Sequence, residues 1–178
     1  MSTVANRYAK ALLDLAVSDG AVDGYQGELS AVSQIYEAES ALNTFLLSPQ
    51  KDLTTKKNVL TNIFNGTVRK NVLNLLLVLA DKGRIELLPD INLVFTKMAD
   101  EYRNILNITI TSALPLNKEQ TDIIGEKFRS LYHVSSVKIT VETDESLVGG
   151  VKVAVGDKLY DGTVRGKLSK MQSALGLS

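Results

Sequence analysis

The sequence predicts a mainly helical protein with a small α/β part: a six-helix bundle over residues 1–104, followed by a β-α-β-β-β-α domain over residues 105–178. Up to about residue 104, apolar residues recur at spacings of three and four, which is typical of amphipathic helices. Beyond residue 105 they alternate with polar residues, which is typical of half-buried strands. The 178 residues are 44% hydrophobic and 22% charged, which is a globular composition with enough apolar surface for a core.

In the first predicted helix, apolar residues occupy more than half of the circumference. A stripe of Val4, Tyr8, Ala11, Leu12 and Leu15 is widened by Ala5, Ala9, Leu13 and Ala16. A helix that packs on its own core needs an apolar stripe only about 100° wide. The excess indicates either burial among several neighbours or a surface that binds a partner, and the pattern leaves both readings open.

Five further helices are predicted before residue 105. The second follows Gly20, the third begins after Ser40 as N-cap, and the fourth ends at Gly66. The fifth covers residues 68–81, and its apolar run 75–80 makes it hydrophobic nearly all round. The sixth has apolar residues from Leu88 to Ile105 and tolerates a proline in its first turn.

The second half is predicted to alternate strands with two helices. Strands are expected over 106–111, 137–142, 151–155 and 158–160, and a capping box of Asn117 and Gln120 opens the helix between the first two strands. The last helix has its apolar residues at spacings of four, three and four: Val164, Leu168, Met171 and Leu175.

The composition excludes several classes of function. Because the chain has no Cys and only one His, it has no thiolate, disulfide, iron–sulfur or multi-His metal chemistry. Lys plus Arg and Asp plus Glu each number 20, and this zero net charge argues against a nucleic-acid binder. The charge is uneven along the chain: −4 over residues 1–50, +3 over 51–104 and +1 over 105–178. The first two segments either face each other or present solvated helix faces.

No motif predicts a catalytic residue, a cofactor site or a metal site. His133 lies at a helix end without a nucleophile elbow nearby, which favours a capping role. The segment 162–167 resembles a phosphate loop, but it has three residues between its glycines instead of four and lacks the hydroxyl residue after its Lys. The basic residues of the last helix either are solvated or face an acidic partner or anionic lipid. We therefore expect a binding module.

We expect neither a signal peptide nor a membrane span. Residues 1–20 place charges at helical spacing, and no apolar run follows them. The longest apolar run, 75–80, has six residues, whereas a membrane span needs about 20. The expected location is the cytosol.

Three segments resemble one known family. They are 7–12 (RYAKAL), Gly83-Arg84 followed by Leu88-Pro89, and the long segment 147–168 (LVGGVKVAVGDKLYDGTVRGKL). Together they resemble the delta subunit of F-type ATP synthase, the family of the oligomycin-sensitivity-conferring protein. In the last segment the matching signature residues, structural or stalk-binding in the family, are Gly149, Gly150, Gly156, Asp157, Asp161, Gly162, Arg165 and Gly166.

The resemblance implies a non-catalytic stator subunit without cofactors, which couples proton-driven rotation to ATP synthesis. It implies that residues 1–104 bind the N-terminal helix of the alpha subunit in a groove between the first and fifth helices. Residues 105–178 are then expected to bind the b subunits of the peripheral stalk. The groove candidates are Tyr8, Ala9, Leu12, Leu13, Leu76, Leu77 and Leu79. The implied location is peripheral, at the cytoplasmic face of a bacterial membrane. The alternative is a regulatory or scaffolding module unrelated to ATP synthase.

Overall fold

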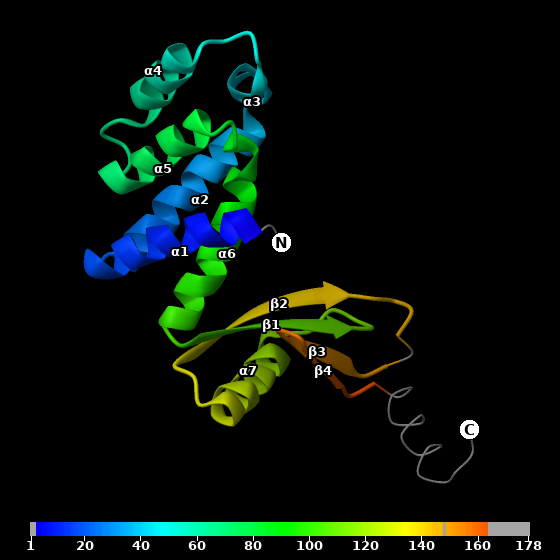
Figure 1. Cartoon of the computed structure of the whole chain (residues 1–178). Coiled ribbons are helices and arrows are strands. Elements are labelled where there is room, and N and C mark those ends of the chain that lie inside the picture. Colours follow the sequence, from blue (N-terminus) through cyan, green and yellow to red (C-terminus); the bar gives the residue numbers. More distant parts are fainter. Residues whose placement is uncertain (1–2, 148, 164–178) are drawn as a thin grey trace. The chain divides into compact units, whose positions relative to one another are not determined.

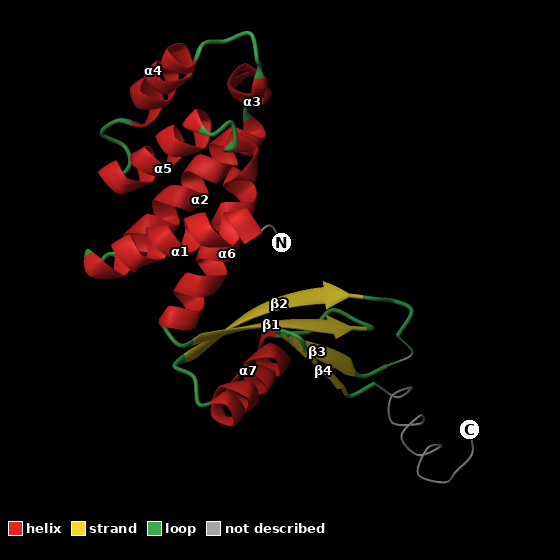
Figure 2. Cartoon of the chain, viewed as in Figure 1, coloured by secondary structure: helices red, strands yellow, loops and turns green. Residues whose placement is uncertain are grey.

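The computed structural model describes residues 3–147 and 149–163, and this part of the chain contains seven α-helices and four strands (Figures 1 and 2). The helices are α1 (Thr3–Ser18), α2 (Val22–Ala38), α3 (Ser40–Leu47), α4 (Leu53–Phe64), α5 (Lys70–Asp81), α6 (Leu88–Tyr102) and α7 (Lys118–Tyr132), with a 3-10 helix, η1 (Ile85–Leu87), before α6. The strands are β1 (Ile105–Ser112), β2 (Ser136–Thr143), β3 (Val151–Val155) and β4 (Lys158–Asp161). The predicted mainly helical fold with a small sheet is confirmed.

The chain divides into two compact units, Met1–Ala99 and Asp100–Ser178, called here the helical unit and the sheet unit. Each unit has its own hydrophobic core. The division falls near the end of α6, whereas the change of period in the sequence lies after residue 104. At this boundary Asp100, although still helical, makes its hydrogen bonds to residues of the sheet unit.

The core of the helical unit is built around α5. Of this helix, Val72, Leu75, Leu76, Leu79 and Ala80 are buried. They are buried on several sides because α5 packs against α1, α2 and α4. A helix that is hydrophobic nearly all round is expected at such a central position. The largest side chains that are almost fully buried in this core are Tyr25, Phe95 and several leucines.

Three helix boundaries differ from the sequence prediction. The N-cap of α3 is Glu39 rather than Ser40, because the Glu39 carbonyl already accepts a hydrogen bond from the N–H of Asn43 at 3.1 Å. Helix α5 begins at Lys70, since Val68 pairs with Asn65 in an isolated bridge. Ile105 begins β1 instead of extending α6, after Asn104 adopts a positive φ of 57° that breaks the helix.

The sheet has the strand order β2-β1-β3-β4. Strands β1 and β2 are parallel and are joined through α7, while β3 pairs antiparallel with both β1 and β4. The predicted capping box at the start of α7 is present: the Asn117 side chain accepts from the N–H of Gln120 at 2.8 Å, and the Gln120 side chain accepts from the N–H of Asn117 at 3.0 Å. The core of this unit gathers Ile108, Ile110, Phe128, Val153 and Val155. The predicted last helix lies outside the described residues.

A buried carboxylate ties the end of α6 to the sheet. The side chain of Asp100 is 1% exposed, and it accepts hydrogen bonds from Lys138 Nζ at 2.7 Å, Arg103 Nη2 at 2.6 Å and Asn107 Nδ2 at 3.0 Å. Burial by itself raises the pKa of Asp100, but the hydrogen bonds from Lys138 and Asn107, together with the charge of Lys138, lower this pKa overall. The ionised form of Asp100 therefore stabilises the sheet unit.

We predict that Asp100→Asn destabilises the protein by about 1–3 kcal/mol at pH 7, because three donors lose a charged acceptor. Since the folded-state pKa of Asp100 lies below its unfolded value of about 3.9, its contribution is complete above that pH and is lost as the pH falls through the folded pKa. The difference in free energy of unfolding between the wild type and the variant should therefore become smaller below about pH 4. Urea unfolding followed by circular dichroism at pH 7 and pH 3 measures both effects. Glu101→Gln, at the exposed neighbouring residue, is the control. A difference in free energy of unfolding between wild type and Asp100→Asn that is equal at both pH values would contradict the prediction.

Candidate partner-binding surfaces

Helices α1 and α5 lie side by side and run antiparallel. At one end, Asn71 Nδ2 in the first turn of α5 donates to Asp19 Oδ2, just beyond α1, at 3.3 Å. At the other end, Arg84 Nη1, just beyond α5, donates to Tyr8 Oη in α1 at 3.4 Å. The helices are antiparallel because the start of α5 lies at the end of α1 and the end of α5 lies near Tyr8. The two contacts also define the register of the pair.

Most of the predicted groove residues lie inside the helical unit. Ala9, Leu12, Leu76 and Leu79 are buried and belong to one core cluster. Tyr8, Leu13 and Leu77 are half-buried and pack against that cluster. The structure therefore brings the seven residues around one core, and packing inside the unit accounts for much of the apolar surface of α1.

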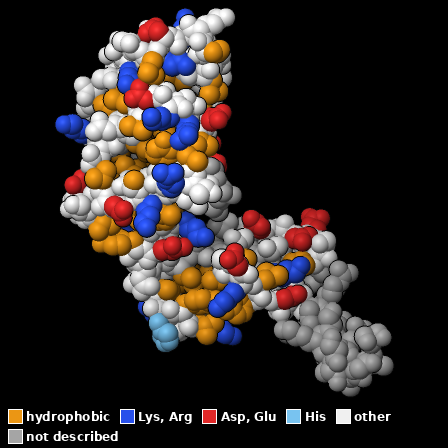
Figure 3. Space-filling model, viewed as in Figure 1, with side chains coloured by type: hydrophobic (Ala, Val, Ile, Leu, Met, Phe, Trp, Pro, Cys, Tyr) orange, Lys and Arg blue, Asp and Glu red, His pale blue; other side chains and the backbone are white. Residues whose placement is uncertain are grey.

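Two exposed apolar residues were not among the predicted groove residues. Leu15 on α1 is 45% exposed and Val78 on α5 is 42% exposed. With Asp19 opposite Asn71, the antiparallel register places Leu15 near the level of Leu75 and Val78 near the level of Leu12. The sequence contained the signal for Leu15, since this residue continues the stripe of Val4, Tyr8 and Ala11. Figure 3 shows that hydrophobic side chains also reach the surface of the helical unit among charged ones.

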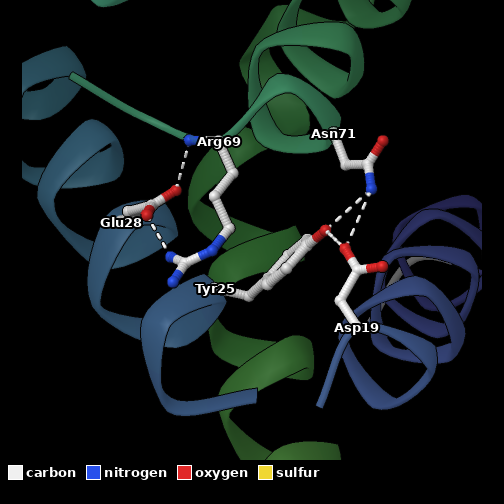
Figure 4. Close-up of polar contacts among 5 residues, drawn as sticks. All are labelled: Asp19, Tyr25, Glu28, Arg69 and Asn71. Carbon is white, nitrogen blue, oxygen red and sulfur yellow. Dashed lines mark hydrogen bonds and ion pairs between the residues drawn. The ribbon is translucent and has the colours of Figure 1, made fainter. Parts of the chain in front are cut away.

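A polar network holds α1, α2 and α5 together at the Asp19 end (Figure 4). The buried Tyr25 of α2 donates its hydroxyl proton to Asp19 and accepts a hydrogen bond from Asn71 Nδ2 at 2.7 Å. Burial raises the pKa of Tyr25, and the hydrogen bond to Asp19 raises it further. The Tyr25 hydroxyl therefore stays protonated and links Asp19, at the end of α1, to Asn71 of α5.

Arg69 completes the network from the segment before α5. Its guanidinium pairs with Glu28 and lies 5.5 Å from the centre of the Tyr25 ring, while its backbone N–H donates to Glu28 Oε2 at 2.6 Å. A Cβ atom at Gly24 would overlap with this guanidinium, so glycine leaves the room that Arg69 occupies. The network fixes where α5 begins relative to α2 and so helps to position α5 beside α1.

In the sheet unit, the signature glycines allow two backbone segments to approach each other. Gly150 has a φ of +84°, and a Cβ atom there would lie 2.6 Å from the carbonyl oxygen of Gly162 and 2.7 Å from the Cα of Thr163. The N–H of Gly162 donates to the carbonyl of Val151 at 2.9 Å. The bond continues the pairing of β3 with β4, and the close approach of residues 150–151 to 162–163, called here the backbone crossing, gives Gly150 and Gly162 a structural role.

Three of the remaining signature residues, Gly156, Asp157 and Asp161, form turns beside this crossing. Gly156 has a φ of +56° and forms the turn between β3 and β4 with Asp157. Asp161 accepts hydrogen bonds from the backbone N–H and the hydroxyl of Thr163, at 2.9 Å and 2.7 Å. Gly149 lies directly before this crossing in the chain, while Arg165 and Gly166 lie outside the described residues.

His133 has the capping role that the sequence predicts. It adopts a left-handed conformation with φ +54°, and its backbone N–H donates to the carbonyl of Arg129 at the end of α7. Among the residues that the structure describes, no group of three or more His, Asp or Glu side chains is arranged to hold a metal ion. No helix within residues 3–147 and 149–163 combines the length and hydropathy of a membrane span.

These features define a class of protein: a binding protein with two separately packed units, in which apolar helix surfaces are the candidates for contact.

Comparison with known proteins then identifies the family. The family model described as "ATP synthase delta (OSCP) subunit" matches residues 4–175. The chain is 37% identical over 175 residues to the ATP synthase subunit delta of Acetivibrio thermocellus, covering 98% of both chains. It is 36% identical over 172 residues to that of Bacillus thuringiensis, covering 97% of this chain and 95% of the relative.

The chain belongs to the ATP synthase delta (OSCP) subunit family, and its role is that of a non-catalytic stator subunit of F-type ATP synthase. Solved structures support the fold. A chain in the mitochondrial ATP synthase hexamer of Toxoplasma gondii matches with a TM-score of 0.73 at 24% identity, covering 98% of both chains. A chain in the Polytomella F-ATP synthase matches with a TM-score of 0.52 at 17% identity, covering 57% of this chain and 91% of that one. An unrelated regulatory or scaffolding module is not favoured by these findings.

We predict that Tyr25→Phe lowers the free energy of unfolding by about 1 kcal/mol, because Asp19 and Asn71 lose the hydroxyl that joins them. Thermal and urea unfolding of the full chain, followed by circular dichroism, measure this change. The exposed Tyr102, changed to Phe, serves as a control that should stay within about 0.5 kcal/mol of the wild type. Equal stability of the Tyr25→Phe variant and the control would contradict a structural role of the network.

Proposed function

We propose that this chain performs its stator role through two separate attachments. Residues 1–104, as a six-helix bundle, bind the N-terminal helix of the alpha subunit in the catalytic head. Residues 105–178, as a domain of the order β-α-β-β-β-α, bind the b subunits of the peripheral stalk. We place the protein at the cytoplasmic face of a bacterial membrane, where it is held peripherally as part of the complex.

The observation that carries the first attachment is the antiparallel pair of α1 and α5, with apolar side chains exposed along it. Leu15 and Val78 lie on these two helices within about one helical turn of each other along the pair, and each is more than two-fifths exposed. An amphipathic helix that lies in a groove between two helices is a recurrent mode of peptide recognition. Burying a Leu-sized side chain contributes about 1.5–3 kcal/mol, so a few such anchors outweigh the cost of ordering the bound helix.

The seven groove candidates take two different parts in this proposal. Tyr8, Leu13 and Leu77 keep accessible surface and are able to touch a bound helix. Ala9, Leu12, Leu76 and Leu79 are buried and act from beneath, by setting the distance between α1 and α5. A large polar substitution at Ala9 therefore tests folding rather than binding, and variants at the exposed positions are the sharper test.

The physical task of the connector explains why two units are needed. Rotation of the central shaft exerts a torque on the catalytic head, and this torque has to be resisted through a connection to the membrane sector. A chain that binds the head with one unit and the stalk with the other provides that connection without any reacting group. The separate hydrophobic cores of the two units support this division of roles.

We predict that Leu15→Glu and Val78→Glu each weaken binding of a peptide from the alpha-subunit N-terminus by about tenfold or more, since each places a charge in an apolar contact. Isothermal titration calorimetry with the full chain measures the affinity.

Ile63→Glu on α4 is the matched control, because Ile63 is 44% exposed and lies on a different helix of the same unit. This variant should bind as the wild type does. Unchanged peptide affinity in both the Leu15 and Val78 variants, with folded circular dichroism spectra, would overturn the α1–α5 assignment.

A further inference from the structure

In the sheet unit, α7 covers the sheet unevenly. On its β2 side the packing is close, since a Cβ atom at Gly125 would lie 3.0 Å from Ile139 Cδ1. On the opposite side, the ring of Phe128 contacts that of Tyr160 on β4, and Tyr132 contacts Tyr160 and Lys158 of the same strand. A helix is about 10 Å across and strands are about 4.8 Å apart, so one helix covers about two strands of a four-stranded sheet. Within the described residues, the side near β4 therefore keeps apolar surface open.

This surface is the tyrosine patch, which consists of Ile124, Leu131, Tyr132 and Tyr160 around the buried ring of Phe128. Leu131 is 56% exposed, Tyr160 is exposed, and Ile124 and Tyr132 are half-buried. The ring of Phe128 meets that of Tyr160 edge-on at 5.2 Å, and the hydroxyls of Tyr132 and Tyr160 share a hydrogen bond of 2.7 Å. The aromatic side chains are thus held in place before any partner arrives, which lowers the entropy cost of binding.

Basic side chains lie within and beside the patch. Lys127 lies one helical turn from Leu131, and Lys158 Nζ lies 5.9 Å from the centre of the Tyr132 ring. The acidic neighbours are Asp157, in the turn before Lys158, and Glu119, near the start of α7. Asp122 and Glu126 belong to the β2 side of α7, where they line a hollow with Arg129, and Glu126 pairs with Arg129 at 2.9 Å. Figure 3 shows hydrophobic side chains gathered on the sheet unit with Lys or Arg among them, close to the pale-blue His.

We propose that the tyrosine patch receives the peripheral stalk, as an amphipathic helix of the b subunit whose apolar stripe is flanked by carboxylates. This inference rests on the proposed stalk attachment of the sheet unit and names the surface that makes it. Tyrosine-rich apolar patches carry much of the energy in protein interfaces, and the two lysines select acidic residues beside the stripe of the incoming helix.

The test measures binding of the soluble C-terminal segment of the b subunit to the full chain by calorimetry at low and high salt. Leu131→Glu should weaken binding by about tenfold or more, because it places a charge at the centre of the contact. A double variant, Lys127→Glu with Lys158→Glu, should weaken binding several-fold at low salt and less at high salt. Leu159→Glu is the matched control: Leu159 is 64% exposed on the same strand, but it points to the opposite face of the sheet from Tyr160. Circular dichroism verifies that each variant is folded.

The outcomes separate this inference from the proposed function. If the wild-type chain does not bind the b segment, the stalk attachment itself fails. If the wild type binds and folded Leu131→Glu binds equally well, or if Leu159→Glu is the variant that loses binding, the tyrosine patch is overturned as the site. A Leu131→Glu variant that loses thermal stability as steeply as it loses binding also overturns it, because the patch is then covered within the chain.

Discussion

The antiparallel contact between α1 and α5 is the constraint on which the helical unit depends. Its interior is tight because α1 contributes small side chains such as Ala5, Ala9 and Ala16, which are all fully buried. Small residues allow neighbouring helices to approach α1 closely, and α5, with buried leucines on several sides, packs against α1, α2 and α4. The same contact leaves Leu15 and Val78 on the outside. The core and the proposed binding surface are therefore two sides of one helix pair.

Polar side chains fix the register of α1 and α5 where α1 ends and α5 begins. Tyr25 extends from α2 to Asp19 and Asn71, while Arg69 pairs with Glu28 of α2. In the sheet unit, Asp100 plays a comparable part, since its carboxylate joins the end of α6 to β1 and β2. In both places a buried polar group with several partners specifies one geometry, whereas apolar packing alone tolerates several. A stator subunit transmits force between its partners, and a single defined geometry keeps its binding surfaces in fixed positions within each unit.

The period of the apolar residues predicted the elements well because helices and strands in this chain each bury one face. The capping box of Asn117 and Gln120 was predictable because it is local. Which apolar residues are exposed was not predictable, since Ala9 and Leu15 share the apolar side of α1 and the positions of the neighbouring helices decide which of them is buried. The hydrogen bonds of Tyr25, Arg69 and Asp100 were equally hidden, because their partners are distant in sequence. The glycine crossing at Gly150 and Gly162 appeared in the sequence as a motif, and the structure supplied its reason.

The proposed stator role requires one chain to bind two partners at the same time, and a bridging experiment tests this most directly. The b-subunit segment is immobilised, and purified catalytic head is passed over it with and without this chain while captured head is measured. We predict that the head is retained only when the chain is present, in an amount equal to the chain bound. Retention of the head without the chain, or binding of the chain to only one partner at a time, would contradict it.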